Sequence, residues 1–149
     1  MRVLAWIKSI AQELVNRYST TNPYELASCL NIEVISWDLH EEIRGFYKFE
    51  RRNKFIVINN NLDDDLKRIV CAHELGHAIL HPRANTPFMK KHTLLSVEKI
   101  ELEANSFAAH LLIPDESLFN YYEQTTIYDI ASLHNVPFEL VELKCKGLF

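Results

Sequence analysis

The first thirty residues show the hydrophobic spacing of helices. Apolar side chains recur at steps of three and four residues, which predicts a helix with one buried stripe that ends near Ser19. Asn22 before Pro23 is a helix start signal, so a short second helix is expected over 23–30. The residues of the first stripe are Val3, Leu4, Ile7, Ile10, Ala11, Leu14, Val15 and Tyr18.

The pattern then changes to short runs that favour β-strands. Ile32–Ile35, Gly45–Phe49 and Lys54–Ile58 are rich in β-branched and aromatic residues, and the polar turn Glu50–Asn53 separates the last two. These runs predict a small, three-stranded antiparallel sheet. For Gly45–Phe49 two roles stay open: pairing inside the sheet, or alignment of a substrate backbone by β-augmentation.

Two long helices are predicted in the middle of the chain. One runs from about Asp63, where three aspartates suit a helix start, to His81. After an irregular loop over 82–92, the other runs from about Ser96 to Ile113 and is stopped by Pro114.

The C-terminal segment reads as two further helices around 134–136, which is the length of a helix-turn-helix. Its second helix offers Glu139 and Glu142 against Lys144 and Lys146, so packing is favoured over DNA binding. The predicted fold class is α+β, mainly helical, in a single domain over 1–149. N-terminal helices take up 1–30, the sheet and the two long helices 31–114, and a C-terminal helical pair 115–149.

Composition narrows the class of protein. The 149 residues are 48% hydrophobic and 24% charged, with a net charge of −4, which is typical of a soluble globular protein and unsuited to direct nucleic-acid binding. Cys29, Cys71 and Cys145 lie far apart and are odd in number, so reduced thiols are expected. With no apolar run that could cross a membrane, the sequence predicts a cytoplasmic protein.

The segment His73-Glu-Leu-Gly-His77 carries the clearest chemical signal. Four residues advance about 6 Å along a helix and rotate about 40°, so the two imidazoles can converge on one metal ion. Glu74 lies about 100° around the helix from His73, where it can act as a general base on a metal-activated water. Gly76 inside the helix indicates a close approach by another element.

A third ligand has to come from elsewhere. His81 lies about 12 Å along the axis from His73, which excludes it as a ligand of the same tetrahedral centre. On the helix that follows, Glu101 sits about 40° from the centre of the apolar stripe, so it is the carboxylate that the fold would bury. Asn105, one turn later, can orient a ligand histidine.

The remaining polar residues of this helix are expected at the surface. Glu98 and Glu103 sit more than about 100° from the stripe, and we expect both on a solvated face. His110 points away from Glu101 and is expected to be exposed. Tyr121, Tyr122 and His134 suit a transition-state donor by residue type alone, and none is assigned.

These motifs resemble the ImmA/IrrE family of zinc metallopeptidases. HELGH at 73–77 and ELEANSFAAHLLIP at 101–114 are similar to its two signature segments, and the gluzincin pattern of H-E-x-x-H with a later E-x-x-A-[D/N] implies Glu101 as ligand and Asn105 beside it. Asparagine stands where an acidic residue is common in related zincins. The resemblance implies a zincin-like fold and a Zn²⁺ cofactor held by His73, His77 and Glu101.

The resemblance also implies a function. It predicts a cytoplasmic zinc endopeptidase of a prophage or mobile element that cleaves a helix-turn-helix repressor, with Glu74 as the catalytic residue. The alternative is a non-hydrolytic zinc-containing protein that sequesters a repressor or toxin partner. A zinc hydrolase acting on a small amide is a third hypothesis, which a closed pocket instead of an open groove would favour.

Overall fold

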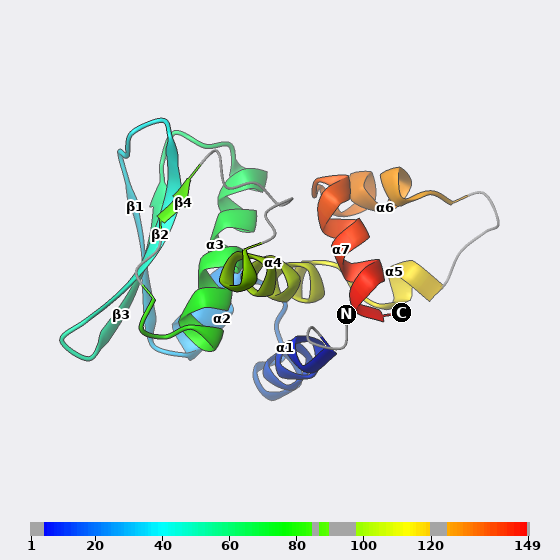
Figure 1. The fold of residues 1–149 in the computed structure, drawn as a ribbon, viewed down its shortest axis with the longest axis horizontal. Coiled ribbons are helices and arrows are strands. Elements are labelled where there is room, and N and C mark those ends of the chain that lie inside the picture. Colours follow the sequence, from blue (N-terminus) through cyan, green and yellow to red (C-terminus); the bar gives the residue numbers. More distant parts are fainter. Residues whose placement is uncertain (1–4, 85–86, 90–97, 120–124, 149) are drawn as a thin grey trace.

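The computed structural model describes residues 5–84, 87–89, 98–119 and 125–148. A four-stranded sheet lies at one end of the molecule, α3 and α4 lie in the middle, and α5 to α7 lie at the other end (Figure 1). The elements, in chain order, are α1 (Ala5–Tyr18), α2 (Pro23–Cys29), β1 (Ile32–Trp37), β2 (Ile43–Glu50), β3 (Asn53–Asn59), α3 (Asp64–Leu80), β4 (Pro87–Met89), α4 (Lys99–Leu112), α5 (Glu116–Phe119), α6 (Ile127–His134) and α7 (Phe138–Leu148).

The α+β class is confirmed, but the sheet differs from the predicted one. Its strand order is β1-β3-β2-β4, and β1 pairs with β3 in parallel. The predicted antiparallel hairpin of β2 and β3 is present, with Arg51 and Arg52 both at positive φ in its two-residue loop, as the twist of such a hairpin favours. β1 and β2 follow each other in the chain but do not pair. β3 lies between them in the sheet, so β1 pairs with β3 instead of β2.

The stretch predicted as an irregular loop contains a short strand. β4 pairs antiparallel with the start of β2, where Gly45 is opposite Phe88. Gly45 also packs closely on α3, because an added Cβ would lie 2.7 Å from a side-chain carbon of Val70. β2 therefore has a neighbour on each side at this point, and pairing within the sheet explains Gly45–Phe46 without a substrate strand.

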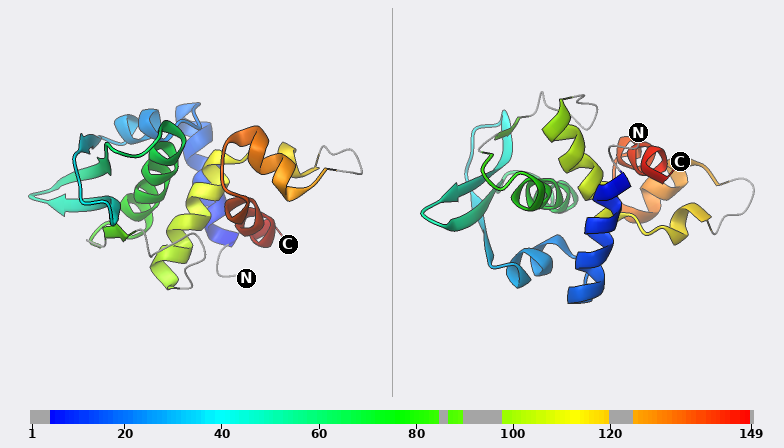
Figure 2. Two further views of the ribbon diagram at one scale, coloured as in Figure 1. Left: turned by 90° about the horizontal axis from the view of Figure 1, so that it is seen from above. Right: turned by 60° about the horizontal axis from the view of Figure 1, so that its bottom comes forward.

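Helix α4 is enclosed by other helices. It packs against α3 on one side and against α1 and α7 on others, and both views of Figure 2 show α1 beside it. Every residue from Glu103 to Leu112 is buried as a result. A helix covered on several faces has no single buried stripe, which matters for the polar residues that it carries.

The predicted C-terminal helix pair is present as α6 and α7. Thr126 and Asp129 form a reciprocal cap at the start of α6, and Asn135 ends that helix in the left-handed conformation. The described part of the chain contains no helix that combines the length and the apolar character needed to cross a membrane.

Candidate metal centre

Helix α3 fixes the first two candidate ligands. Its start is capped by Asp63, whose carboxylate accepts from the backbone N–H of Leu66 at 2.8 Å. The residues from Ile69 to Ala78 are all buried, so His73 and His77 lie in the interior between the sheet and α4. Their rings are 4.8 Å apart between centroids and nearly perpendicular, at 84°.

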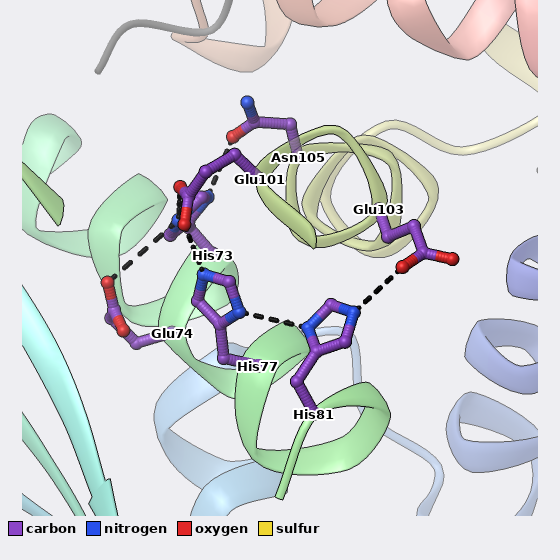
Figure 3. A network of polar contacts seen from close by, with 7 residues as sticks. All are labelled: His73, Glu74, His77, His81, Glu101, Glu103 and Asn105. Atoms are coloured by element: carbon purple, nitrogen blue, oxygen red, sulfur yellow. Dashed lines mark hydrogen bonds and ion pairs between the residues drawn. The ribbon is translucent and has the colours of Figure 1, made fainter. Parts of the chain in front are cut away.

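Helix α4 brings the third candidate ligand, Glu101, to the same point. A Cβ built on Gly76 of α3 would lie 3.1 Å from the backbone of Ala104 and 3.2 Å from Phe107, so the two helices meet closely here. The glycine predicted to mark a close approach therefore does so. This contact places Glu101, about one turn before Ala104, directly over the two imidazoles (Figure 3).

The three side chains converge on one small volume. Glu101 Oε2 is 3.0 Å from His73 Nε2, and Glu101 Oε1 is 3.0 Å from His77 Nε2. One ligand atom from each residue lies within 4.8 Å of the others, and all three residues are buried. Tetrahedral zinc ligands at about 2 Å from the ion lie about 3.3 Å from one another, so this spacing suits a small cation.

The polar atoms here fit a cation better than they fit each other. Among the described residues, His77 Nε2 and both oxygens of Glu101 are buried without a hydrogen bond of ordinary geometry. The 3.0 Å separations are short enough for such bonds, but the groups lack the alignment. Unsatisfied buried polar atoms cost free energy. Two imidazole nitrogens and one carboxylate that face a single point are the donor set of a metal site.

Glu74 occupies the position expected of a base beside the ligands. Its Oε1 is 3.9 Å from His73 Nε2, and its side chain is completely buried. In the described part of the chain neither carboxylate oxygen forms a well-aligned hydrogen bond. Burial first, and the negative charge of Glu101 second, raise the pKa of Glu74 well above its ordinary value, while the backbone of Tyr47 lowers it. A carboxylate with a raised pKa is a more effective proton acceptor.

The charges of two candidate ligands, His77 and Glu101, are those that metal binding requires. Burial, assisted by the nearby His73, lowers the pKa of His77 in spite of Glu101, so its imidazole is neutral near pH 7. Burial acts to raise the pKa of Glu101, but the two imidazoles outweigh it and hold that pKa below the ordinary value. His77 therefore presents a neutral imidazole nitrogen, and Glu101 presents a carboxylate.

Each candidate imidazole is held by a second contact at its other nitrogen. His73 Nδ1 lies 2.7 Å from Asn105 Oδ1, the contact expected for that asparagine. His77 Nδ1 lies 3.0 Å from His81 Nδ1, and His81 Nε2 lies 2.9 Å from Glu103 Oε1 (Figure 3). Helix geometry excludes His81 as a ligand, but it does not exclude this contact, and the i, i+4 spacing from His77 to His81 is the sequence signal for it.

Two surface predictions are wrong. Glu103 and His110 are each only 8% exposed, whereas Glu98 is exposed as predicted. The helical wheel assumed one buried stripe, but α1 and α7 cover other faces of α4. Glu103 has a polar partner in His81, and His110 lies in the interior near Lys144 of α7.

No residue is assigned as the donor that would stabilise the transition state. Tyr121 and Tyr122 lie outside the described residues. His134, at the end of α6, has its Nε2 2.6 Å from the hydroxyl of Ser117 in the C-terminal helical segment.

Comparisons with known proteins agree with this arrangement. The family model described as the IrrE N-terminal-like domain, a peptidase family, matches residues 27–146. The chain is 58% identical over 139 residues to an uncharacterized immunity region protein 2 of Bacillus phage phi105, covering 93% of this chain and 88% of the relative. It is 28% identical over 141 residues to the metallopeptidase ImmA of Bacillus subtilis (strain 168), covering 93% and 83%.

The family implies a metal ion, and His73, His77 and Glu101 form a group that could hold one. The matched segment contains both the α3 and the α4 residues of that group. The chain therefore belongs to the ImmA/IrrE family of peptidases.

Proposed function

We propose that the protein is a zinc-dependent endopeptidase whose metal is held by His73, His77 and Glu101. The observation that carries this proposal is the convergence of these three buried side chains, with Glu74 beside them. Three protein ligands leave a fourth position open, which is typical of a catalytic zinc site, whereas structural sites are usually closed by four.

When bound, Zn²⁺ supplies the Lewis acidity that activates water and polarises a peptide carbonyl. Glu74 is the proton carrier of this reaction: its carboxylate accepts a proton from the attacking water and later delivers it to the amine of the leaving group. A bond forms between the water oxygen and the carbonyl carbon, and the peptide C–N bond breaks. The complete burial of Glu74 keeps bulk water from exchanging with that proton between the two transfers.

We further propose that the substrate is a helix-turn-helix repressor of a prophage or mobile element. One relative is named for a phage immunity region and another is named metallopeptidase ImmA, which supports a protein target in the control of immunity. Direct nucleic-acid binding is not part of this function, because the chain carries a net charge of −4.

The test is cleavage by the zinc-loaded protein. Purified helix-turn-helix repressors of the element that carries the gene are incubated with the wild type, with Glu74→Gln and with Glu41→Gln, and fragments are identified by mass spectrometry. Glu41 is exposed in the turn before β2, so its variant makes the same chemical change away from the site. We expect cleavage by the wild type and Glu41→Gln, and a loss of at least about 100-fold in Glu74→Gln.

Other outcomes separate the alternatives. Cleavage of a repressor by Glu74→Gln at the wild-type rate removes Glu74 from the proposed role. Tight binding of a repressor by the wild type and by Glu74→Gln, without cleavage by either, favours the sequestering alternative.

A further inference from the structure

A line of three side chains leads away from the candidate metal centre. His77 Nδ1 is 3.0 Å from His81 Nδ1, and His81 Nε2 is 2.9 Å from Glu103 Oε1. The side chains of His81 and Glu103 are 12% and 11% exposed, so water has little access to the pair. Figure 3 shows the line running from the ligand ring on α3 to the far side of α4.

Proton positions along this line are linked. A metal at Nε2 of His77 requires a lone pair there, so the ring proton of His77 must be on Nδ1. That N–H can donate only if His81 Nδ1 accepts, which places the proton of a neutral His81 on Nε2. The Nε2–H of His81 then donates to the carboxylate of Glu103, an acceptor that ends the line.

The opposite arrangement is unfavourable at both ends. If His81 Nδ1 carried the proton and donated to His77, then His77 would be protonated on Nε2, where a metal could not bind. His81 Nε2 would also face the carboxylate of Glu103 with a lone pair, so two acceptors would lie 2.9 Å apart. The carboxylate therefore selects the tautomers that leave His77 ready for a metal.

We propose that His81 and Glu103 are positioning residues: Glu103 fixes the tautomer of His81, and His81 fixes the tautomer and ring orientation of the metal ligand His77. The inference rests on the proposed metal site. It gives the two imidazoles different supports, because His73 is held directly by the neutral amide of Asn105 and His77 is held through a second imidazole that ends at an anion. A carboxylate at the end of such a line also makes the ligand nitrogen more basic.

The first measurement is zinc affinity, determined by competition with a chromophoric chelator. His81→Phe removes the acceptor for His77, and we expect the dissociation constant for zinc to rise 10- to 100-fold, the range seen when such supporting groups are lost. His81→Gln keeps a carbonyl acceptor and should recover most of the affinity. His40→Phe, at an exposed histidine before β2, is the matched control and should bind zinc as the wild type does.

The order of the line is tested by combining variants. Glu103→Met should weaken zinc binding in the wild-type background, whereas Glu103→Gln, which retains an oxygen acceptor, should stay within about threefold of the wild type. In the His81→Phe background, Glu103→Met should have no further effect, because the carboxylate acts only through His81. Equal effects of Glu103→Met in both backgrounds would overturn the relay.

Nuclear magnetic resonance gives a readout that needs no variant. In the zinc-loaded protein, two-bond ¹H–¹⁵N spectra should show His77 protonated on Nδ1 and His81 protonated on Nε2. His81 protonated on Nδ1, or wild-type zinc affinity in both His81→Phe and Glu103→Met, contradicts the proposal. These results are separate from the proposed function: a wild type without zinc binding defeats both, while zinc binding that is insensitive to residues 81 and 103 defeats the relay alone.

Discussion

Two regions at opposite ends of α4 hold acidic side chains in different ways. Near its start, Glu101 is buried beside His73 and His77, and among the described residues its two oxygens have no aligned hydrogen bond. Just past its end, Asp115 is surrounded by donors from two other helices. Its Oδ1 lies 2.6 Å from Lys144 Nζ, and its Oδ2 lies 3.2 Å from Lys8 Nζ.

The difference separates a structural cluster from a candidate ligand site. At Asp115 the protein itself supplies the positive charge, including that of Lys144, which is only 1% exposed. At Glu101 the partners are imidazoles, and one of them, His77, is kept neutral because burial lowers its pKa. A buried carboxylate without a permanent cation from the chain is stabilised best by one from solution. The two ends of α4 therefore differ in whether cationic side chains of the protein itself neutralise the carboxylate.

The largest expected effect is the response of the two ends to zinc. Free zinc at 1,000 times its dissociation constant should raise the free energy of unfolding of the wild type by about 4.1 kcal/mol. Glu101→Gln removes the only charged ligand of the proposed site and should lose most of that gain. Asp115→Asn should lower the stability without zinc but keep the gain. Denaturant unfolding with and without zinc measures both.

The opposite pattern in the two variants would contradict this distinction between Glu101 and Asp115. A zinc-induced gain that survives in Glu101→Gln and disappears in Asp115→Asn would place the cation at the wrong end of the helix. An equal gain in both variants would mean that the bound zinc needs neither carboxylate.

The sequence predicts one end of α4 much better than the other. His73, His77 and Glu101 follow from helix periodicity because their spacing within each helix decides which side chains face inward, and the structure brings all three together. Lys144 and Asp115 meet only because α7 returns to pack against α4, and Lys144 was assigned to a weakly charged packing helix. The hydrophobic periodicity within one helix does not show which distant helix packs against it.

The same limit explains the errors in the sheet and in the buried polar residues. The turn Glu50–Asn53 fixes the β2–β3 hairpin locally, but the parallel pairing of β1 depends on a crossing that no short run encodes. Glu103 and His110 were expected in solvent because a wheel describes one helix at a time. In the structure α4 also packs against α1 and α7, which come from the two ends of the chain.

The next effect concerns pH and His110, which lies near the Asp115 cluster. Burial first, then the charges of Lys144 and Lys8, lower its pKa from 6.5 to about 4, and Asp115 opposes them. Between pH 6.5 and 4 the unfolded chain therefore binds a proton that the folded chain does not. The free energy of unfolding is unaffected by this group above pH 6.5 and should fall by on the order of 3 kcal/mol as the pH drops to 4.

The measurement uses protein freed of metal by a chelator, so that acid release of a bound ion cannot contribute. His110→Gln has no titrating ring at this position, and its stability should decline less than that of the wild type between pH 7 and pH 4. His77 and His134 also have lowered pKa values and contribute in the same direction, but they do so in both proteins. Identical declines would show that His110 is protonated as easily in the folded chain as in the unfolded one.

The smallest expected effect tests whether the Asp115 cluster is structural. Lys144→Met removes the buried ammonium but leaves Asp115, 27% exposed, with Lys8 and water, so we expect a loss of about 1–3 kcal/mol in the free energy of unfolding, less than for a fully buried pair. Lys8→Met, at a side chain 28% exposed, should cost less than about 1 kcal/mol.

Zinc affinity should be unchanged in both lysine variants. The lysines neutralise Asp115 and not Glu101, and Asp115 lies beyond the opposite end of α4 from Glu101. Adding Asp115→Asn to Lys144→Met sharpens the test. If the loss in Lys144→Met comes from a carboxylate that has lost its cation, removing the charge of that carboxylate should restore part of the stability. A double variant with the full sum of the two separate losses would instead mean that the two side chains stabilise the fold independently, and that this end of α4 is held by packing and not by its internal charge pairing.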